Sequence, residues 1–470
     1  MTVTDAPAGR SDSGHSDTAH PDSTHPRSEN RDTTHPGATD TGATDTGGPH
    51  AGGGAGAGGG WQPSQALRQA DPQLADLLAA EAERRAESVQ LLAGENLTSP
   101  AVLAALGGPL IDKYAEGYPG RRHHTGCTLA DAAELLAVDR ARALFAAPHA
   151  NVQPRSATSA MLAAYAALLR PGDVVLSMSL EHGGHLSCGS RANFSGRWFE
   201  FVGYGVREDD GLVDLDQVRE LARRHRPKAI IAGGISYPRH LDWAAFREIA
   251  DEVDAYLIAS AAQTVGLVAG GVAPSPVPYA DITVAATHKL LRGPRGGLLL
   301  CTSELADRVD RAVFPFTQGG AAMNEVAGKA VAFAEAATPE YREYARRTVA
   351  GARALAAGLA GAGLRPTTGG TDTHLVTADV SPLGVSGAEA ERRCAAVGLM
   401  LGKCALPYDP APAAESSGIR LGTGAVTAQG MGETELTEIA ALVGQVLEGG
   451  PQARIGARVR ELAWRFAGRG

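Results

Sequence analysis

A lysine and a run of glycines lie together in the segment Thr287-His288-Lys289, which follows the apolar sequence ITVAA and precedes LLRGPRGG. A lysine at the end of a buried strand is costly unless it is paired or used chemically. Its amine can form a Schiff base with a carbonyl compound and so act as a covalent catalyst. The glycines allow the backbone to approach a ligand closely. A surface lysine after an edge strand would give the same pattern, so both interpretations stay open at this point.

A second candidate site is the run Ser156-Ala157-Thr158, which follows NVQPR and opens the helical sequence SAMLAAYAALL. Small hydroxyl residues at a helix N-terminus, where backbone N–H groups are free, suit a phosphate group. The same residues serve as ordinary helix N-caps. The pattern alone does not choose between these roles.

The sequence Glu181-His182-Gly183-Gly184-His185 follows the apolar run VVLSM. Ligands of α/β sheets bind at the carboxyl ends of strands, where an imidazole flanked by glycines can lie flat against a cofactor ring. A metal site is the alternative. It is less favoured, because the nearby sequence offers only Glu181 as an acidic ligand and no cysteine pair.

Arg420 lies between apolar residues and glycines in SSGIRLGTGA. An arginine in this setting is well suited to bidentate capture of a substrate carboxylate. A structural ion pair would explain the residue equally well.

The elements that must position these residues alternate between strand and helix. Polar or glycine- and proline-rich turns and helical stretches separate the apolar runs, which predicts crossover connections and a mostly parallel sheet. After Gln318-Gly319-Gly320 the sequence pattern no longer alternates regularly between strand and helix, and we expect a smaller α+β domain there. Strands are predicted at residues 174–178, 228–232, 256–259, 282–286 and 374–380. Helices are predicted at about residues 72–87, 128–147 (with Asp131 in a capping box), 323–359, 387–397 and 433–447.

Composition places the chain among globular proteins. The chain has 470 residues with 44% hydrophobic and 20% charged residues, and a net charge of −9 with both signs spread along it. This balance argues against a nucleic-acid or anionic-membrane surface. Five cysteines without a C-x-x-C pair fit a reducing cytoplasm. There is no apolar run of membrane-spanning length.

We predict three regions. Residues 1–60 are a polar, glycine-rich tail that should be disordered, and its histidines suit a solvated tail better than a metal site. Residues 61–345 should form an N-terminal arm and the large ligand-binding domain. Residues 346–470 should form the small domain.

The motifs occur in one order across most of the folded chain: LLAGENLTS, KYAEGYPGRRHHTG, NVQP, EHGGHL, NFSG, THKLLRGPRGG, QGG, GGTDTHL and SGIRLGT. This order resembles serine hydroxymethyltransferase, a fold-type-I pyridoxal phosphate (PLP) enzyme. The resemblance implies an α/β large domain with a seven-stranded, mostly parallel sheet, a smaller C-terminal α+β domain, and a PLP cofactor.

The resemblance also implies roles for single residues in cofactor binding. Lys289 would form the Schiff base with PLP, and His182 would stack on the pyridine ring. Ser156 and Thr158 would hold the phosphate, and Ser236 would lie near the 3′-oxygen. The implied cofactor-binding set is completed by Ala157, Ser260, Gln263, His288, Gly319 and Gly320.

On the substrate side, the resemblance implies that Arg420 binds the amino-acid carboxylate. Tyr114 and Glu116 would reach toward the substrate, with Glu116 as the acid or base of hydroxymethyl chemistry. Gly319 and Gly320 would come from the neighbouring subunit, which implies a homodimer. Gly94, His123 and His124 would occupy further substrate positions, with His124 as a catalytic candidate.

Several positions depart from the family pattern. Where the family has an aspartate that bonds the pyridine nitrogen, followed three residues later by a histidine, this chain has Ser260 and Gln263. A serine hydroxyl cannot supply the charge that keeps the ring nitrogen protonated, so the electron sink for a Cα carbanion should be weaker. Water together with Gln263 could compensate.

Other departures lie at substrate and folate positions. The family's paired tyrosines are His123 and His124, and imidazoles titrate near neutrality. Gly94 stands where the family has a serine, and Cys404 stands where the family has an asparagine that helps to bind folate. In the phosphate loop, Ala157 stands where a glycine is usual.

Three functions follow as alternatives. The first is a repurposed enzyme for other Cα or Cβ chemistry on an amino acid in specialised metabolism, by β-elimination or replacement, transaldol transfer or decarboxylation. The second is serine–glycine hydroxymethyl transfer with tetrahydrofolate, a cofactor that these substitutions leave open. The third is a non-catalytic PLP-binding homologue, which the retained Lys289 and Arg420 oppose. We place the first ahead of the second.

Overall fold

The computed structural model describes residues 61–468. The tail predicted for residues 1–60, with its histidines, lies outside the described part of the chain. The helix predicted near residues 72–87 is α2 (Pro72–Ala86), which α1 (Gln65–Ala70) precedes. Within the described residues, no helix is both long and apolar enough to cross a membrane.

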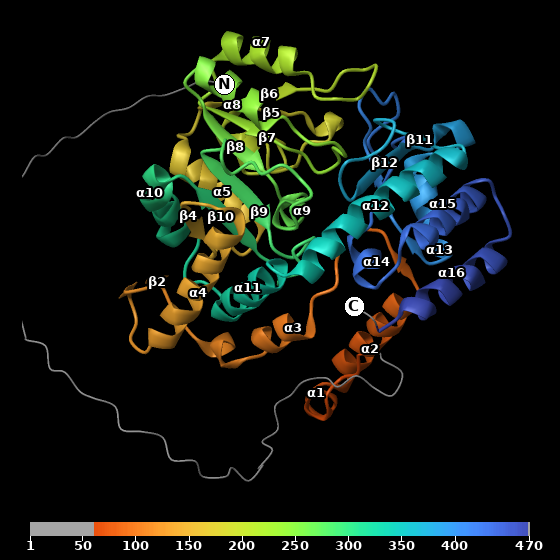
Figure 1. Cartoon of the computed structure of the whole chain (residues 1–470), viewed down its shortest axis with the longest axis horizontal. Helices are drawn as coiled ribbons and strands as arrows, with labels where there is room; N and C mark the ends of the chain where they lie inside the picture. The colour runs from red at the N-terminus through yellow and green to blue at the C-terminus, as the bar shows by residue number, and fades with distance from the viewer. Residues whose placement is uncertain (1–60, 469–470) are drawn as a thin grey trace, which may run out of the picture. The chain divides into compact units, whose positions relative to one another are not determined.

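A seven-stranded sheet forms the centre of the larger part of the fold (Figure 1). Its order is β4-β10-β9-β8-β7-β5-β6. The five strands from β9 to β6 are parallel, whereas β10 is antiparallel to both of its neighbours. The predicted α/β class with a mostly parallel sheet is confirmed. The strands are β4 (His149–Asn151), β5 (Val174–Met178), β6 (Glu200–Tyr204), β7 (Ala229–Ala232), β8 (Tyr256–Ser260), β9 (Ile282–Ala286) and β10 (Gly297–Cys301).

Helices cover both faces of this sheet. On β9, Val284 joins the core under α5 and α10, whereas Ala285 packs toward α4 and α11. On β7, Ile230 joins a third core with α7 and α8. Successive strand side chains point to opposite faces, so burying both faces requires continuous apolar runs. The helices are α4 (Thr128–Phe145), α5 (Ala157–Leu168), α7 (Leu215–His225), α8 (Trp243–Glu252), α10 (Ala306–Arg311) and α11 (Met323–Ala336).

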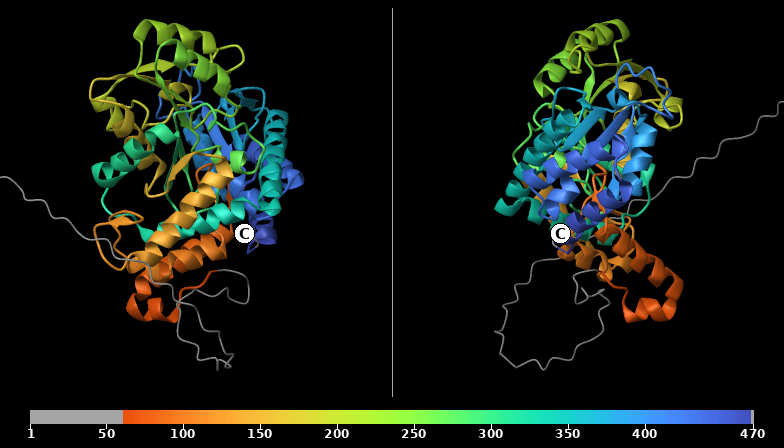
Figure 2. Two further views of the ribbon diagram at one scale, coloured as in Figure 1. Left: turned by 60° about the vertical axis from the view of Figure 1, so that its left-hand side comes forward. Right: turned by 90° about the vertical axis from the view of Figure 1, so that its right-hand side faces the viewer.

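A four-stranded antiparallel sheet of order β11-β12-β15-β14 organises the C-terminal part. Figures 1 and 2 show its teal and blue elements gathered beside the larger sheet. Segments from both ends of the described chain meet here, because β1 (Val89–Gln90) pairs with β13 (Leu399–Met400). The other elements are β11 (Arg365–Pro366), β12 (Leu375–Asp379), β14 (Gly402–Cys404), β15 (Gly418–Gly422), α12 (Pro339–Gly361), α13 (Gly387–Ala396), α14 (Gly424–Ala428), α15 (Glu433–Leu447) and α16 (Gln452–Phe466). Short elements elsewhere are α3 (Pro100–Leu106), β2 (Gly117–Tyr118), β3 (Arg121–Arg122), α6 (Ser195–Trp198) and α9 (Val265–Ala269).

The helical stretch expected across residues 323–359 is divided into two helices, α11 and α12, by Ala337 and Thr338. After α11 ends at Ala336, the side chain of Thr338 caps α12 by accepting a hydrogen bond from the backbone N–H of Tyr341 (3.3 Å). Pro339 takes the first helical position, where its missing N–H costs nothing. The division into domains at residues 345 and 346 stays a prediction, and α12 spans that point.

The expected capping box at Asp131 is wrong, because this carboxylate serves an ion cluster instead. Asp131 accepts hydrogen bonds from the backbone N–H of Gly120 (2.9 Å) and from Arg122 (2.7 Å). The guanidinium of Arg122 also donates to Glu134 (2.6 Å), whose other oxygen accepts from Gln153 (2.7 Å). The side chains of Arg122 and Glu134 are 3% and 2% exposed. This cluster ties the β2–β3 turn to α4 and to the strand before α5.

Removing one member of a buried ion cluster leaves the others uncompensated, which costs about 3–5 kcal/mol. We therefore expect Glu134→Ala to lower the free energy of unfolding by about this amount in chemical denaturation. The control is Glu343→Ala, which removes an exposed pair with Arg346 on α12 and should change stability very little. Equal effects of the two substitutions would contradict the role given to the cluster.

Candidate functional site

Lys289 lies in a short loop directly after β9. Thr287 closes the loop: its N–H donates to the carbonyl of Gly296 (3.1 Å) and its hydroxyl to that of Pro294 (2.7 Å). Burial, together with the neighbouring charges of Arg420 and Arg295, lowers the pKa of Lys289 to about 8. The amine is therefore nearer than an ordinary lysine to the neutral form that attacks a carbonyl carbon.

Arg420 is the central residue of β15, and it crosses to the larger sheet. One nitrogen of its guanidinium donates to the carbonyl of Ile235 (3.0 Å) and to the hydroxyl of Ser236 (3.3 Å). Within residues 61–468, no carboxylate forms an ion pair with Arg420, so the structural ion pair considered above is absent there. Burial lowers the pKa of its guanidinium. A largely buried cation without an anionic partner suits an anionic ligand.

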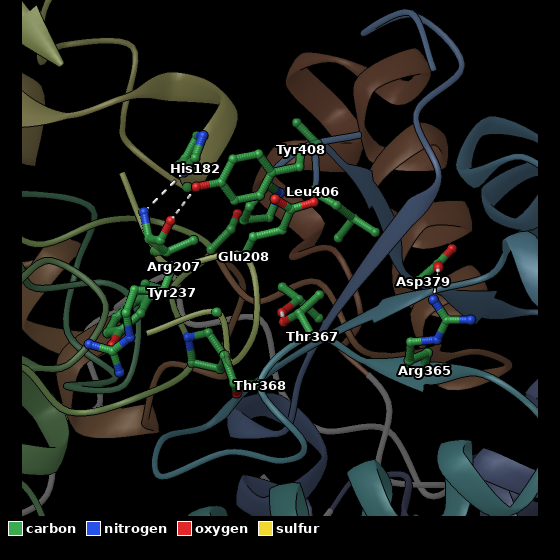
Figure 3. Close-up of a pocket in the computed structure, with 18 residues that line it drawn as sticks. His182, Arg207, Glu208, Tyr237, Arg365, Thr367, Thr368, Asp379, Leu406 and Tyr408 are labelled. Atoms are coloured by element: carbon green, nitrogen blue, oxygen red, sulfur yellow. Dashed lines mark hydrogen bonds and ion pairs between the residues drawn. The ribbon is translucent and has the colours of Figure 1, made fainter. Parts of the chain in front are cut away.

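His182 lies just beyond the carboxyl end of β5, where it is held by the backbone of Val206. Its Nδ1 accepts a hydrogen bond from the N–H of Val206 (3.0 Å), and the carbonyl of Val206 accepts one from the hydroxyl of Tyr408 (2.6 Å) (Figure 3). The Tyr408 ring meets the imidazole edge to face at 4.8 Å. Burial lowers the pKa of His182. Since Nδ1 accepts, the neutral imidazole carries its proton on Nε2.

The turn around His182 depends on its glycines. Gly183 adopts a φ of +103°, and a Cβ on Gly184 would lie 2.2 Å from the carbonyl oxygen of Met178. A cavity of about 200 Å³ opens beside this turn, between the loop that follows β6 and the C-terminal part (Figure 3). His182, Ser236 and Tyr408 are among the residues that line it.

Ser156 caps α5 with a reciprocal capping box. Its hydroxyl accepts from the N–H of Ser159 (3.0 Å), and the Ser159 hydroxyl accepts from the N–H of Ser156 (2.9 Å). The capping role weighed above is thus present. No hydrogen bond in the described chain uses the N–H groups of Ala157 and Thr158, so these donors remain free for an anion.

The remaining predicted cofactor residues lie at the ends of β8 and β9. Ser260 is the last residue of β8 and lines a small cavity of about 30 Å³ with Gly233 and Gly234. Gln263 is 4% exposed, and its Oε1 has no hydrogen-bond partner. The Nδ1 of His288 also lacks a partner. Burial lowers the pKa of His288 to about 4, and the charge of Lys289 adds to this effect.

Gly94 lies in the segment that packs on β15. The preceding residue, Ala93, is so close to Gly422 that a Cβ on this glycine would lie 2.6 Å from the Cα of Ala93. A Cβ on Gly94 itself would meet no atom within 4 Å. Cys404 lies on the neighbouring strand β14, and burial raises the pKa of its thiol to about 12.

A second group of predicted residues lies together at the surface. The hydroxyl of Tyr114 donates to Glu116 (3.1 Å), whose other oxygen lies 3.0 Å from Nε2 of His124. The hydrogen bond with His124, more than that with Tyr114, lowers the pKa of Glu116. Gly320 approaches the same carboxylate, since a Cβ there would lie 3.2 Å from Cγ of Glu116. Gly319 precedes it.

This surface group is separate from the group around Lys289. Tyr114 is 61% exposed, and the ring of His123 packs 5.5 Å from that of Phe314. No hydrogen bond or ion pair among residues 61–468 joins Glu116 or His124 to Lys289, Arg420 or His182. One chain thus carries two incomplete groups of predicted site residues.

Two residues near the first group were not identified from the sequence. His374 precedes β12, is 1% exposed and has no hydrogen-bond partner at either ring nitrogen. Burial lowers its pKa to about 3, with a further contribution from Lys289. Its position in the GGTDTHL motif was the available signal. Tyr408 gave no signal, because its contact with His182 exists only in the folded chain.

The geometry defines a class of ligand. A largely buried amine, a guanidinium without a carboxylate partner, and free N–H groups at a helix N-terminus lie in one part of the fold. The charged neighbours that shift the pKa of Lys289, His185 and His288 are all cations. Such a site suits a carbonyl compound that carries negative charge, as in PLP-dependent enzymes.

Comparison with known proteins agrees with a PLP-dependent enzyme. The family model described as serine hydroxymethyltransferase matches residues 67–443. A serine hydroxymethyltransferase from Desulforapulum autotrophicum is 47% identical over 402 residues, which covers 85% of this chain and 97% of the relative. The chain therefore belongs to the serine hydroxymethyltransferase family. It is a PLP-dependent transferase of fold type I.

The residues present fit PLP. Lys289 supplies an amine with a lowered pKa, and α5 offers unused N–H groups to a phosphate. The unpartnered buried atoms of Gln263 and His288 offer polar contacts to a ligand at the ends of β8 and β9. The substitution at Ser260 does not remove any of these features.

The lowered pKa of Lys289 can be measured without cofactor. In competitive labelling of the apo-protein with trace acetic anhydride, only the neutral amine reacts. Labelling of Lys289 should therefore rise with pH through a midpoint at about 8 and level off above it. Mass spectrometry of the Lys289 peptide follows the reaction. A midpoint near the ordinary lysine value of about 10.4 would contradict the buried, cation-rich environment.

Proposed function

We propose that this enzyme transfers a hydroxymethyl group between serine and glycine, with tetrahydrofolate as the one-carbon carrier. The observation that carries the proposal is Arg420, a largely buried guanidinium without a carboxylate partner, whose charge acts on Lys289. It supplies a receptor for an amino-acid carboxylate beside the amine that binds the cofactor. The relative that is 47% identical, named serine hydroxymethyltransferase, supports the same reaction. This proposal reverses the order of the first two alternatives in the sequence analysis.

The residues of the chain divide the work as follows. When bound, PLP supplies an electron sink for charge that develops at the amino-acid Cα. Arg420 orients the substrate by its carboxylate, and Lys289 holds or releases the cofactor and can move a proton at Cα. Neutral His182, fixed by Val206, packs against the cofactor ring. The N-terminus of α5, at Ser156–Thr158, holds the phosphate.

The Tyr114–Glu116–His124 group handles the proton of the substrate hydroxyl. A carboxylate that is hydrogen-bonded to a phenol and an imidazole can accept or return that proton. We propose that this group, with Gly319 and Gly320, completes the active site of a partner subunit in a homodimer. The exposure of the group, and the absence of a described contact between it and Lys289 of its own chain, support this arrangement.

Ser260 favours a second candidate function. It stands at the end of β8 without a carboxylate, and its neutral hydroxyl would leave the pyridine nitrogen less readily protonated. The family scaffold would then serve other Cα or Cβ chemistry, such as β-elimination or replacement, transaldol transfer or decarboxylation. Cys404, a half-buried residue whose thiol has a raised pKa, adds to this second candidate because it changes a position that helps to bind folate in the family.

Turnover of serine separates the two candidates. Purified PLP-loaded enzyme should form glycine from L-serine only when tetrahydrofolate is present. Arg420→Ala should lower kcat/KM by two to three orders of magnitude, or about 3–4 kcal/mol, because a buried charge pair with the substrate is lost. Arg346→Ala, on the exposed face of α12, is the matched control and should keep full activity. Release of ammonia and a keto acid, or glycine formation from threonine without folate, would favour the second candidate.

Mixing of inactive variants tests the shared site. Arg420→Ala and Glu116→Ala should each be inactive, but subunit exchange between them should restore about a quarter of wild-type activity. Half of randomly formed dimers are hybrids, and each hybrid has one intact site out of two. Size-exclusion chromatography of each variant controls for assembly. No recovery despite formation of hybrid dimers would show that both residues act within one chain.

A further inference from the structure

Lys329 is a fully buried lysine that neither group of site residues uses. It lies on α11 and is 0% exposed. Its ammonium donates to three backbone carbonyls, those of Val152 (2.6 Å), Pro154 (2.8 Å) and Gly297 (3.1 Å). Burying a lysine without a carboxylate at hydrogen-bonding distance is costly. Such a residue requires an explanation beyond filling the core.

The three carbonyls belong to the two segments that carry the cofactor residues. Val152 and Pro154 lie in the stretch that leads to Ser156 and the N-terminus of α5. Gly297 begins β10, directly after the loop that carries Lys289. The N–H of Gly297 also donates to the carbonyl of Pro154 (2.9 Å), so Lys329 and Gly297 share one acceptor.

Two glycines make room for the close packing around Lys329. A Cβ on Gly296 would lie 2.4 Å from Cε of Lys329, and a Cβ on Gly297 would lie 2.2 Å from the carbonyl oxygen of Ser156. The glycines thus let the lysine and the end of the phosphate segment approach the same strand. A shift of the lysine would move both segments.

The number of donors matches the number of acceptors. An ammonium has three N–H donors and no acceptor, and here each proton has one carbonyl. A neutral amine would turn its lone pair toward one of these oxygens. Burial, with a smaller effect of Arg155, lowers the pKa of Lys329 to about 7, although Glu325 and Glu134 act to raise it. The geometry suits the charged form, which holds three carbonyls at one point.

We propose that Lys329 is a positioning residue that fixes the phosphate-binding end of α5 relative to the loop of Lys289. The aldehyde and the phosphate arm of PLP are carried on neighbouring ring carbons, so the distance between them is limited. The two segments must therefore keep a matching separation for both groups to be bound at once. This inference rests on the proposed phosphate site at Ser156–Thr158. It does not depend on which amino-acid reaction the enzyme performs.

The test compares PLP with pyridoxal, which lacks the phosphate. Apo-protein of the wild type and of Lys329→Met is titrated with each aldehyde, and binding is followed by the absorbance of its imine with Lys289. We expect Lys329→Met to weaken PLP at least tenfold while changing pyridoxal affinity much less. The ratio of the two affinities is the readout, because a general loss of stability would weaken both ligands together.

Two further variants keep the test decisive. Phe333→Leu, in the core of the same helix, should lower the thermal midpoint of the apo-protein without changing the affinity ratio. Gly296→Ala retains the charge of Lys329 but displaces its side chain, and it should reproduce the selective loss of PLP. Gly296→Ala also replaces Lys329→Met as the test variant if Lys329→Met does not fold. Equal weakening of PLP and pyridoxal, or no change in either, would overturn the proposal. Serine turnover by the wild type, measured separately, shows whether the proposed reaction itself fails.

Discussion

The structure depends on holding the positive charges of Lys289 and Arg420 in a largely buried site. Burial removes water from the charged forms of Lys289 and Arg420 and so lowers both pKa values, and the charge of Arg420 lowers the pKa of Lys289 further. The charged neighbours that shift His185 and His288 are cations as well. Such a site is unfavourable until an anionic ligand enters it. A phosphate and an amino-acid carboxylate both bring negative charge. Ligand binding therefore offsets the unfavourable free energy of burying unpaired positive charge.

The fold assembles this site from distant parts of the chain. His182, Ser236 and Lys289 follow β5, β7 and β9, and Ser260 is the last residue of β8. The carboxyl ends of these parallel strands meet at one edge of the sheet. Arg420 arrives from β15 of the C-terminal sheet and bonds to the loop after β7. The site therefore forms only when both sheets are folded and packed.

Much of this layout could be predicted from the sequence, because strands that are buried on both faces are continuous apolar runs. Residues at their ends are then expected at one edge, and the motif order linked Lys289, His182 and Arg420. Other features could not be predicted. The partners of Asp131 and Lys329 depend on which backbone groups folding leaves nearby, and Tyr408 meets His182 from more than 200 residues away in the chain. The helix start at Thr338 and Pro339 could have been predicted from capping rules. It was missed because the apolar pattern continues across these residues.

A crystal structure of the PLP-loaded protein tests the central claim most directly. The account predicts a covalent bond between Nζ of Lys289 and the cofactor, with the phosphate at the N-terminus of α5 and His182 against the ring. Arg420 of the same chain should face the substrate position, and Glu116 of the partner subunit should close it. A cofactor bound away from Lys289, or a phosphate held by other residues, would contradict the account.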